Sequence, residues 1–202
     1  MNDDDYMTRV ASHEILEALT DPSPGLGFFI DEAAPPWLGS AWAAGDDDEV
    51  GDLCTSTRIT LGGWTYQRIW SNVAASSGGD PCLPAMSQPY FNTSVAQEWF
   101  QIPAGGSMDI PVTAWATGPR ADWYVYPLVS PLSAGFHARI ASSKQQMLDG
   151  IAYNAVNNGE SATLTVTAPQ APSGTHAVIR VWSRTADGTD GAHFWLLGVF
   201  IP

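Results

Sequence analysis

Polar and apolar residues alternate in short runs over most of the chain, and this rhythm predicts strands rather than helices. From about residue 96 onward, turns rich in Gly, Pro and Asn separate six such runs. The runs are QEWFQIPA, SMDIPVTAWAT, DWYVYPLV, SATLTVTAP, HAVIRVWSR and FWLLGVFIP. This spacing predicts a β-sandwich, Ig-like or jelly-roll-like. A further segment, SKQQMLDGIAYNAV, fits either a short helix or a strand with a loop.

Residues 7–19, MTRVASHEILEAL, have the period of a helix instead, and the prolines and glycine of TDPSPG end it. One side of this helix is an apolar stripe of Met7, Ala11, Ile15 and Ala18. The other side carries the polar residues His13, Glu14, Glu17 and Asp21. At about 100° per residue, these four polar side chains share one arc of the helix surface.

Residues 22–52 read as a loop, and RITLGGWTYQRIWSN reads as a hairpin around Gly62 and Gly63. The whole pattern predicts an α+β chain. In this prediction, residues 1–95 form a small helix-and-loop region that holds a metal site, and residues 96–202 form the all-β sandwich. A helix of this kind so close to Met1 also leads us to expect that 1–95 is the C-terminal part of a larger catalytic domain.

The charge and the apolar content of the chain exclude some classes of function. The formal net charge is −13, and no basic surface exists to replace the counterions of nucleic acid, so nucleic-acid binding is not expected. Residues 1–95 hold 14 of the 21 acidic and three of the eight basic residues, which makes this part the candidate for binding a cation. No run of apolar residues is long enough to predict a membrane span.

Cys54 and Cys82 are the only cysteines, and both lie in loop-like sequence. A disulfide between them is the favoured reading, with two buried thiols as the alternative. The disulfide would indicate a secreted or cell-surface protein. MNDDDYMTRV has neither the basic nor the apolar region of a signal peptide, so we expect a missing or processed front end.

The stretch SHEILEALTDP carries the candidate chemistry. In zinc peptidases with an H-E-x-x-H helix, the two histidines bind the metal and the glutamate polarises the attacking water. Here His13 and Glu17 have the ligand spacing, and Glu14 has the position of the general base. A glutamate ligand makes zinc a weaker Lewis acid than a histidine does, so efficient hydrolysis is less strongly predicted than metal binding. An ion pair of His13 with Glu17 on a solvated helix face is the alternative.

A third ligand has to come from elsewhere in the chain. The segment GDDDEVGDLC offers Glu49 and Asp52, and it resembles the second motif of gluzincin peptidases. That resemblance implies Glu49 as the third ligand and Asp52 as a carboxylate that orients His13. Asp21 and Asp52 are the alternative ligands. Zn²⁺ is the expected metal and Ca²⁺ the alternative.

The motifs ASHEILEALTDP, DEVGDLC and QRIWSN, in this order, resemble a group of secreted metallopeptidase-like proteins. The group has the pattern SHExxEAxTDP…GE(I/V)GDxC and is distantly similar to the plant EXORDIUM/phosphate-induced proteins. The resemblance covers roughly residues 8–83. Residues 46–49, DDDE, depart from the Gly-rich sequence usual there.

Together these features predict a secreted zinc-dependent hydrolase acting on an extracellular peptide or polysaccharide. One alternative is a non-catalytic adhesion or carbohydrate-binding protein stabilised by a metal, and a second is a glycan-active enzyme that uses the same carboxylates. His137, His176 and His193 have no metal-like spacing and are expected to be surface or strand residues. Most aromatic residues of the sandwich are expected in its core, with a sugar-stacking platform as the alternative. They are Trp99, Trp115, Trp123, Tyr124, Tyr126, Trp182 and Trp195.

Overall fold

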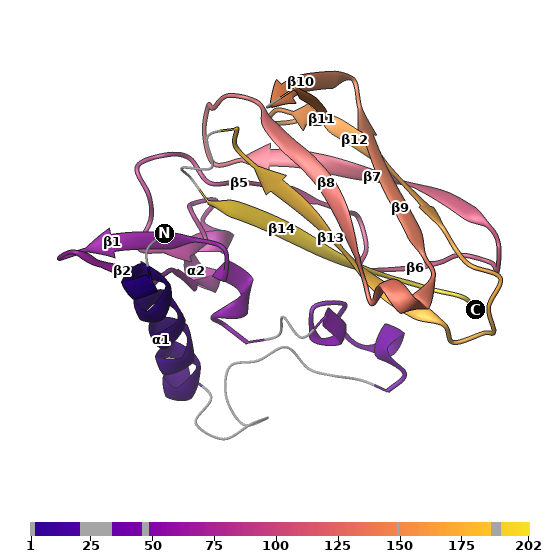
Figure 1. The fold of residues 1–202 in the computed structure, drawn as a ribbon, viewed down its shortest axis with the longest axis horizontal. Coiled ribbons are helices and arrows are strands. Elements are labelled where there is room, and N and C mark those ends of the chain that lie inside the picture. Colours follow the sequence, from indigo (N-terminus) through magenta and orange to yellow (C-terminus); the bar gives the residue numbers. More distant parts are fainter. Residues whose placement is uncertain (1–2, 21–33, 46–48, 149, 187–190) are drawn as a thin grey trace.

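The computed structural model describes residues 3–20, 34–45, 49–148, 150–186 and 191–202. Strands dominate it and form a β-sandwich, as the alternating segments predicted. A smaller unit made of one long helix and a hairpin lies at one end of the sandwich (Figure 1). No described helix has both the length and the apolar character that crossing a membrane requires.

Two sheets make up the sandwich. The four-stranded sheet has the order β5-β7-β12-β9, and its strands are β5 (Phe91–Ser94), β7 (Ser107–Ala116), β12 (Ser161–Thr167) and β9 (His137–Ser142). The six-stranded sheet has the order β10-β11-β8-β13-β14-β6. Its strands are β10 (Lys144–Leu148), β11 (Ile151–Val156), β8 (Trp123–Ser130), β13 (His176–Arg184), β14 (Ala192–Phe200) and β6 (Trp99–Gln101). Among the strands that the structure describes, only β6 and β14 pair in parallel.

Each of the six alternating segments contains one of these strands, so that prediction is confirmed. The ambiguous segment forms the β10–β11 hairpin and contains no helix. Strands β5 and β9 were not predicted. The sandwich already begins at Phe91, a few residues before the predicted start at residue 96, and the division of the chain into two domains stays a prediction.

The core of the sandwich lies between the two sheets. Its fully buried side chains come from inward positions of both sheets, where the alternation placed apolar residues. They include Trp123, Ile110, Leu164, Ile179 and Leu197. Trp123 therefore belongs to the core, as expected for most of the aromatic residues.

The small unit consists of α1 (Asp3–Thr20) against the hairpin of β1 (Arg58–Leu61) and β2 (Trp64–Gln67). Gly62 and Gly63 occupy the turn with φ of 61° and 86°, the left-handed conformation that a two-residue hairpin turn requires. The predicted hairpin is confirmed. A second short pair, β3 (Ile69–Trp70) and β4 (Cys82–Leu83), frames α2 (Asn72–Ser76).

Helix α1 packs on β2 through its polar side and leaves its apolar side exposed. An apolar helical stripe ordinarily packs on the core, but Met7 and Ile15 are 64% and 58% exposed. The polar side of α1 faces β2 instead, and Thr65 and Gln67 of β2 are buried against it. Hydrogen bonds hold this interface, among them Thr65 Oγ1 to the Asp5 carboxylate at 2.7 Å. The polar residues of α1 are thereby gathered inside the small unit.

Residues 34–45 cover one end of the outer face of the six-stranded sheet. This segment contains the short 3-10 turns η1 (Pro36–Leu38) and η2 (Ala43–Gly45). Trp37 stacks on Phe200 at 4.7 Å between ring centroids, and Trp42 stacks on Phe194 at 5.5 Å. A part of the predicted loop therefore serves as a cover for the sheet.

Candidate metal-binding site

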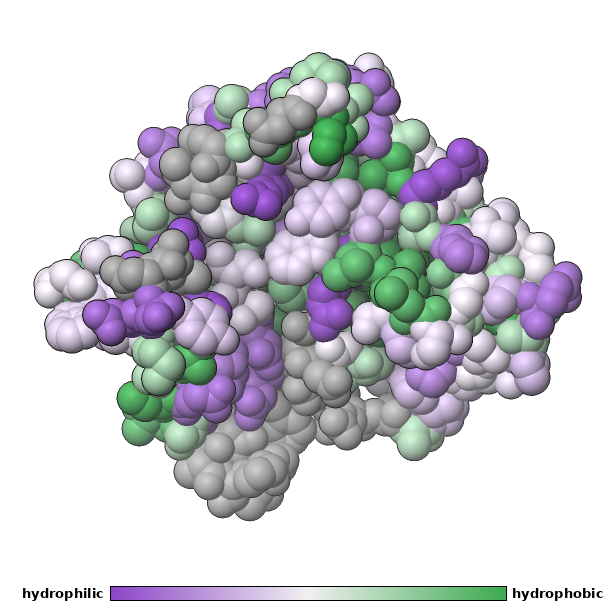
Figure 2. All heavy atoms as spheres, in the orientation of Figure 1, coloured by the Kyte–Doolittle hydropathy of each residue, from purple (hydrophilic) through white to green (hydrophobic). Residues whose placement is uncertain are grey.

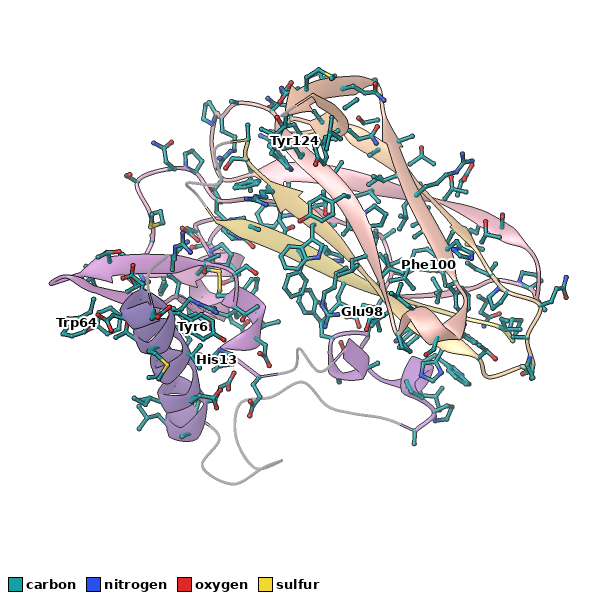
Figure 3. The ribbon with its side chains drawn as sticks, viewed as in Figure 1. Tyr6, His13, Trp64, Glu98, Phe100 and Tyr124 are labelled. Atoms are coloured by element: carbon teal, nitrogen blue, oxygen red, sulfur yellow. A yellow bond between two sulfur atoms is a disulfide. The ribbon has the colours of Figure 1, made fainter. Side chains whose placement is uncertain are left out.

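The polar side of α1 carries the H-E-x-x-E residues and turns them toward the hairpin. His13 and Glu17 lie one helical turn apart, with Nε2 of His13 3.1 Å from Oε1 of Glu17. Next to them, the backbone N–H of Gln67 donates to Oγ of Ser12 at 2.9 Å, which fixes the helix against β2. Figure 3 labels His13 on the side of α1 that faces the rest of the molecule.

Glu49 and Asp52 reach the same place from a turn that ends in η3 (Asp52–Cys54). Oδ1 of Asp52 lies 3.6 Å from Nε2 of His13, and the backbone N–H of Glu49 donates to Oδ2 of Asp52 at 3.4 Å. The disulfide between Cys54 and Cys82 ties η3 to β4, which confirms the predicted bridge. The turn is therefore held covalently at the residue that follows Asp52 by two positions.

Five of the residues predicted from the sequence lie close together, and Glu17 is the one that both ligand clusters share. Ligand atoms of His13, Glu14 and Glu17 lie within 4.8 Å of one another, and so do those of Glu17, Glu49 and Asp52. Among the residues that the structure describes, these are the clusters of three or more possible metal ligands. The alternative ligand Asp21 lies outside the described residues, as do Asp46, Asp47 and Asp48.

Glu17 is the electrostatic centre of this cluster. Burial, followed by the negative charges of Asp52 and Glu49, raises the pKa of the Glu17 carboxyl to about 8. Its Oε1 is buried and accepts no hydrogen bond from the described residues, although Nε2 of His13 is near. A carboxyl with this pKa carries a proton at neutral pH, because a third buried negative charge beside two others is unfavourable.

Gly51 brings the backbone against the site. A Cβ atom at this position would stand 2.6 Å from Oε1 of Glu17 and 3.1 Å from Nδ1 of His13. Its backbone is ordinary, with φ of −71° and ψ of −40°, so the glycine is needed for space and not for an unusual conformation. Glycine at this position therefore leaves the space that the side chains of Glu17 and His13 occupy.

Gln67 orients the histidine, and nothing in the sequence indicated it. Its side-chain Nε2 donates to the backbone oxygen of Gly51 at 2.7 Å and contacts Nδ1 of His13 at 2.8 Å. An amide nitrogen can only donate, so Nδ1 is the acceptor and Nε2 of His13 bears the proton. Asp52 had been expected to orient the ring, but it lies on the Nε2 side, among the possible ligands.

The remaining motif residues have structural roles. Oγ of Ser71 accepts a hydrogen bond from the backbone N–H of Ala74 and caps α2, and Nε1 of Trp70 donates to Oδ1 of Asn72 at 2.7 Å.

His193 is buried and contacts the rings of both Tyr90 and Phe91. Burial, and then the charges of nearby arginines, lower its pKa to about 3. His137 and His176 lie at the starts of β9 and β13 and join neither ligand cluster.

Comparison with known proteins gives only distant likenesses. No family model and no curated protein matches the chain. Among solved structures, domains 4 and 5 of the S-layer protein SbsC match with 16% identity and a TM-score of 0.36, over 56% of this chain and 53% of that one. This chain thus spans about half of that structure.

Two other structures match at the same level. A family 123 glycoside hydrolase from Clostridium perfringens has 10% identity and a TM-score of 0.35, over 57% of this chain and 27% of that one. Domain 1 of VCBP3 from Branchiostoma floridae has 11% identity and a TM-score of 0.34, over 57% and 97%. Likenesses this weak carry no argument about function, which has to rest on the site itself.

Proposed function

We propose that His13, Glu17, Glu49 and Asp52 bind one divalent cation, and that the protein is an exported zinc-dependent, peptidase-like hydrolase. The observation that carries the proposal is the buried Oε1 of Glu17, which has no hydrogen bond from the described residues and lies among other carboxylates. A buried carboxylate beside two other, half-buried carboxylates is stabilised by a proton or by a cation between them. The donors fit a cation, since imidazole and carboxylate are both ligands of zinc.

Loading this site would require His13 to change its tautomer. Nε2 of His13 faces Glu17 and Asp52 and is the nitrogen placed to be a ligand, but it bears the proton here. Binding through Nε2 moves the proton to Nδ1, where it needs an acceptor. Oε1 of Gln67 is buried without a hydrogen bond from the described residues, and rotation of this amide can present it, at the cost of the hydrogen bond from Nε2 to the Gly51 backbone oxygen. Gln67 would then hold the ring in its metal-binding form.

Glu14 would be the general base of the reaction. Unlike Glu17 it is exposed, and its carboxylate lies within 4.8 Å of the ligand atoms of His13 and Glu17. An exposed carboxylate can take a proton from an attacking water and pass it to a leaving group. Bound zinc would supply Lewis acidity to the scissile carbonyl. The disulfide supports export, since such bonds persist in oxidising compartments.

A calcium-stabilised, non-catalytic binding protein is the second candidate. Three of the four proposed ligands are carboxylates, and an oxygen-rich set of donors suits calcium better than it suits zinc. In this reading the cation would only join α1 to the 49–54 turn. A glycan-active enzyme that uses the same carboxylates is the third.

We infer further that the sandwich is Ig-like rather than jelly-roll-like. The order β5-β7-β12-β9 corresponds to the A-B-E-D sheet of an immunoglobulin domain, and β8-β13-β14 correspond to C-F-G. The β10–β11 hairpin is then an addition at the free side of β8. Such a domain would serve as a binding module next to the metal site.

Metal content and hydrolysis test the proposal together. Purified wild-type protein should hold close to one zinc ion by elemental analysis and should cleave a quenched fluorogenic peptide library. Glu17→Gln should lose the metal, whereas Glu14→Gln should keep it and lose the cleavage. Glu160→Gln is the matched control, since Glu160 is a carboxylate of the sandwich that pairs with Lys144. This variant should keep both the metal and the cleavage.

Other outcomes would change the assignment. Wild-type protein that is stable and binds neither zinc nor calcium would refute the metal site. Loss of metal from Glu14→Gln would make Glu14 a ligand. Restored stability with calcium but not with zinc after chelation would favour the binding protein.

A further inference from the structure

The six-stranded sheet opens between β11 and β8. These strands pair only at Ala155 with Tyr124 and at Val156 with Trp123, although β8 continues to Ser130 and β11 begins at Ile151. Beyond these two pairs the β10–β11 hairpin parts from the sheet. A pocket of about 220 Å³ lies there, lined by Tyr124, Tyr126, Leu148, Tyr153 and Arg184.

Three tyrosines supply most of the wall of this pocket. The rings of Tyr124 and Tyr153 pack against each other, with centroids 5.3 Å apart and a tilt of 45°, and both residues line the pocket. Tyr126 lies nearly parallel to Trp182, at 6.4 Å and 12°. Figure 3 labels Tyr124 beside the β10–β11 hairpin, away from α1 and His13. The lining is therefore mainly aromatic, and Leu148 and Arg184 complete it.

The pocket lies at the uncovered end of an aromatic row. From Tyr126 the row continues through Trp182 to Phe194, whose ring is 4.9 Å from that of Trp182. There the cover formed by residues 34–45 begins, with Trp42 on Phe194. Figure 2 shows this face, with a pale surface of intermediate hydropathy over β8 and β13. Of the described residues, Trp42 stacks on the Phe194 end of the row, and no ring of the 34–45 segment contacts the Tyr126 end.

Arg184 gives the pocket its charge. It is exposed at the end of β13 and is the charged residue of the lining. No hydrogen bond or ion pair joins its side chain to another described residue, whereas its backbone lies in the sheet between Tyr124 and Ala192. The nearby acid Asp122 is already engaged, since it accepts from Asn157 at 2.7 Å and pairs with Lys144. The guanidinium can thus present its planar fork to a ligand.

We propose that this pocket binds an acidic sugar, one hexuronate ring of a polysaccharide. Aromatic faces bury the C–H faces of a pyranose, and tyrosine hydroxyls bond its hydroxyl groups. An arginine fork matches a carboxylate with two parallel hydrogen bonds. The volume is below the roughly 300 Å³ at which pockets for drug-sized ligands begin, which suits a single ring. The proposal does not depend on the metal site.

Calorimetric titration with tetragalacturonate tests this site, with EDTA present so that no metal contributes. The wild type should bind the free acid at least tenfold more tightly than its methyl ester, which keeps the rings and removes the charge. Arg184→Gln should weaken binding of the acid by tenfold or more, and Tyr126→Leu should also weaken it. Arg139→Gln, an exposed arginine on β9 of the other sheet, is the matched control and should bind as the wild type does.

Arg184→Lys, which keeps the charge without the fork, should recover only part of the affinity. Glu17→Gln should bind as the wild type does, so failure here and failure of the metal site are distinguishable. Three results would overturn the proposal: absence of binding to the wild type, equal affinity for acid and ester, or equal losses in Arg184→Gln and Arg139→Gln. Thermal melts of each variant confirm that loss of binding is not loss of fold.

Discussion

Gly51 leaves room for the side chains of the candidate metal site, because it has no Cβ atom. Only side-chain ends, Oε1 of Glu17 and Nδ1 of His13, stand in the way of a Cβ atom there. We therefore expect Gly51→Ala to displace these two side chains and leave the fold intact. Zinc affinity should fall by about tenfold or more, since each 1.4 kcal/mol of lost interaction is a factor of ten. Competition with a fluorescent chelator measures it.

Gly79→Ala is the control for that change. Its nearest contact would be the backbone oxygen of Ala74 at 3.5 Å, an ordinary distance, and its φ lies outside the left-handed region. This variant should bind zinc as the wild type does. Equal zinc affinity of Gly51→Ala and wild type would show that Glu17 and His13 are not ligands in the present arrangement.

His193 makes the stability of the sandwich depend on pH. Its folded pKa of about 3 lies below the ordinary value of 6.5, so between these values only the unfolded chain takes up the proton. The free energy of unfolding should therefore fall as pH decreases from about 6.5 toward 3, by up to about 1.4 kcal/mol per pH unit. Above pH 6.5 the group contributes no pH dependence.

Urea denaturation of wild type and His193→Gln at several pH values checks this. Carboxylates contribute to both proteins alike, so the difference between the two curves isolates the histidine. The difference should change below pH 6.5 and stay constant above it. A constant difference over the whole range would mean that His193 has the same pKa in the folded and the unfolded state.

At the scale of elements, the disulfide connects the site turn to the rest of the chain. Cys54 and Cys82 are 28 positions apart and both are buried. Replacing both with alanine frees this loop in the unfolded state and should lower the free energy of unfolding by about 3–4 kcal/mol. Urea denaturation measures it, and the wild type in reducing buffer should approach the variant. Equal stability of variant and oxidised wild type would contradict the prediction.

Helix α1 shows why an element can be predicted while its orientation cannot. The period of residues 7–19 predicted a helix, and α1 spans Asp3–Thr20. The apolar stripe is nevertheless exposed, because Thr65 and Gln67 offer hydrogen bonds to the polar side. A helix packs where its partners are, and β2 lies more than 40 positions away in the chain.

For the whole molecule, a bound cation should act as a crosslink between α1 and the 49–54 turn. A ligand at 100 times its Kd stabilises the folded state by about 2.7 kcal/mol. For a chain of this size that corresponds to a rise in Tm of roughly 5–10 °C. Differential scanning calorimetry with and without zinc measures the rise, and Glu17→Gln should show none. An equal rise in both proteins would mean that zinc binds elsewhere.

Local patterns in the sequence determined six strands of the sandwich, the β1–β2 hairpin, the helix and the pair of cysteines. Each of these depends on neighbouring residues: alternation over a few positions, two glycines in a turn, or a period of 3.6. The same period placed His13, Glu14 and Glu17 on one side of the helix. Strands β5 and β9 escaped prediction, and the segment of the β10–β11 hairpin was left open between a helix and a strand with a loop, because β9 (HARIAS) and β10 (KQQML) hold few large apolar residues.

Only the tertiary structure decided what those elements meet. It brought Glu49 and Asp52 to Glu17, placed Gln67 behind His13, left the apolar stripe exposed, and opened the tyrosine pocket between β8 and β11. These are contacts between distant parts of the chain, and their free energy depends on burial and on partners that no local pattern contains. The pKa of Glu17 is one example: spacing places the carboxyl, and packing sets its charge.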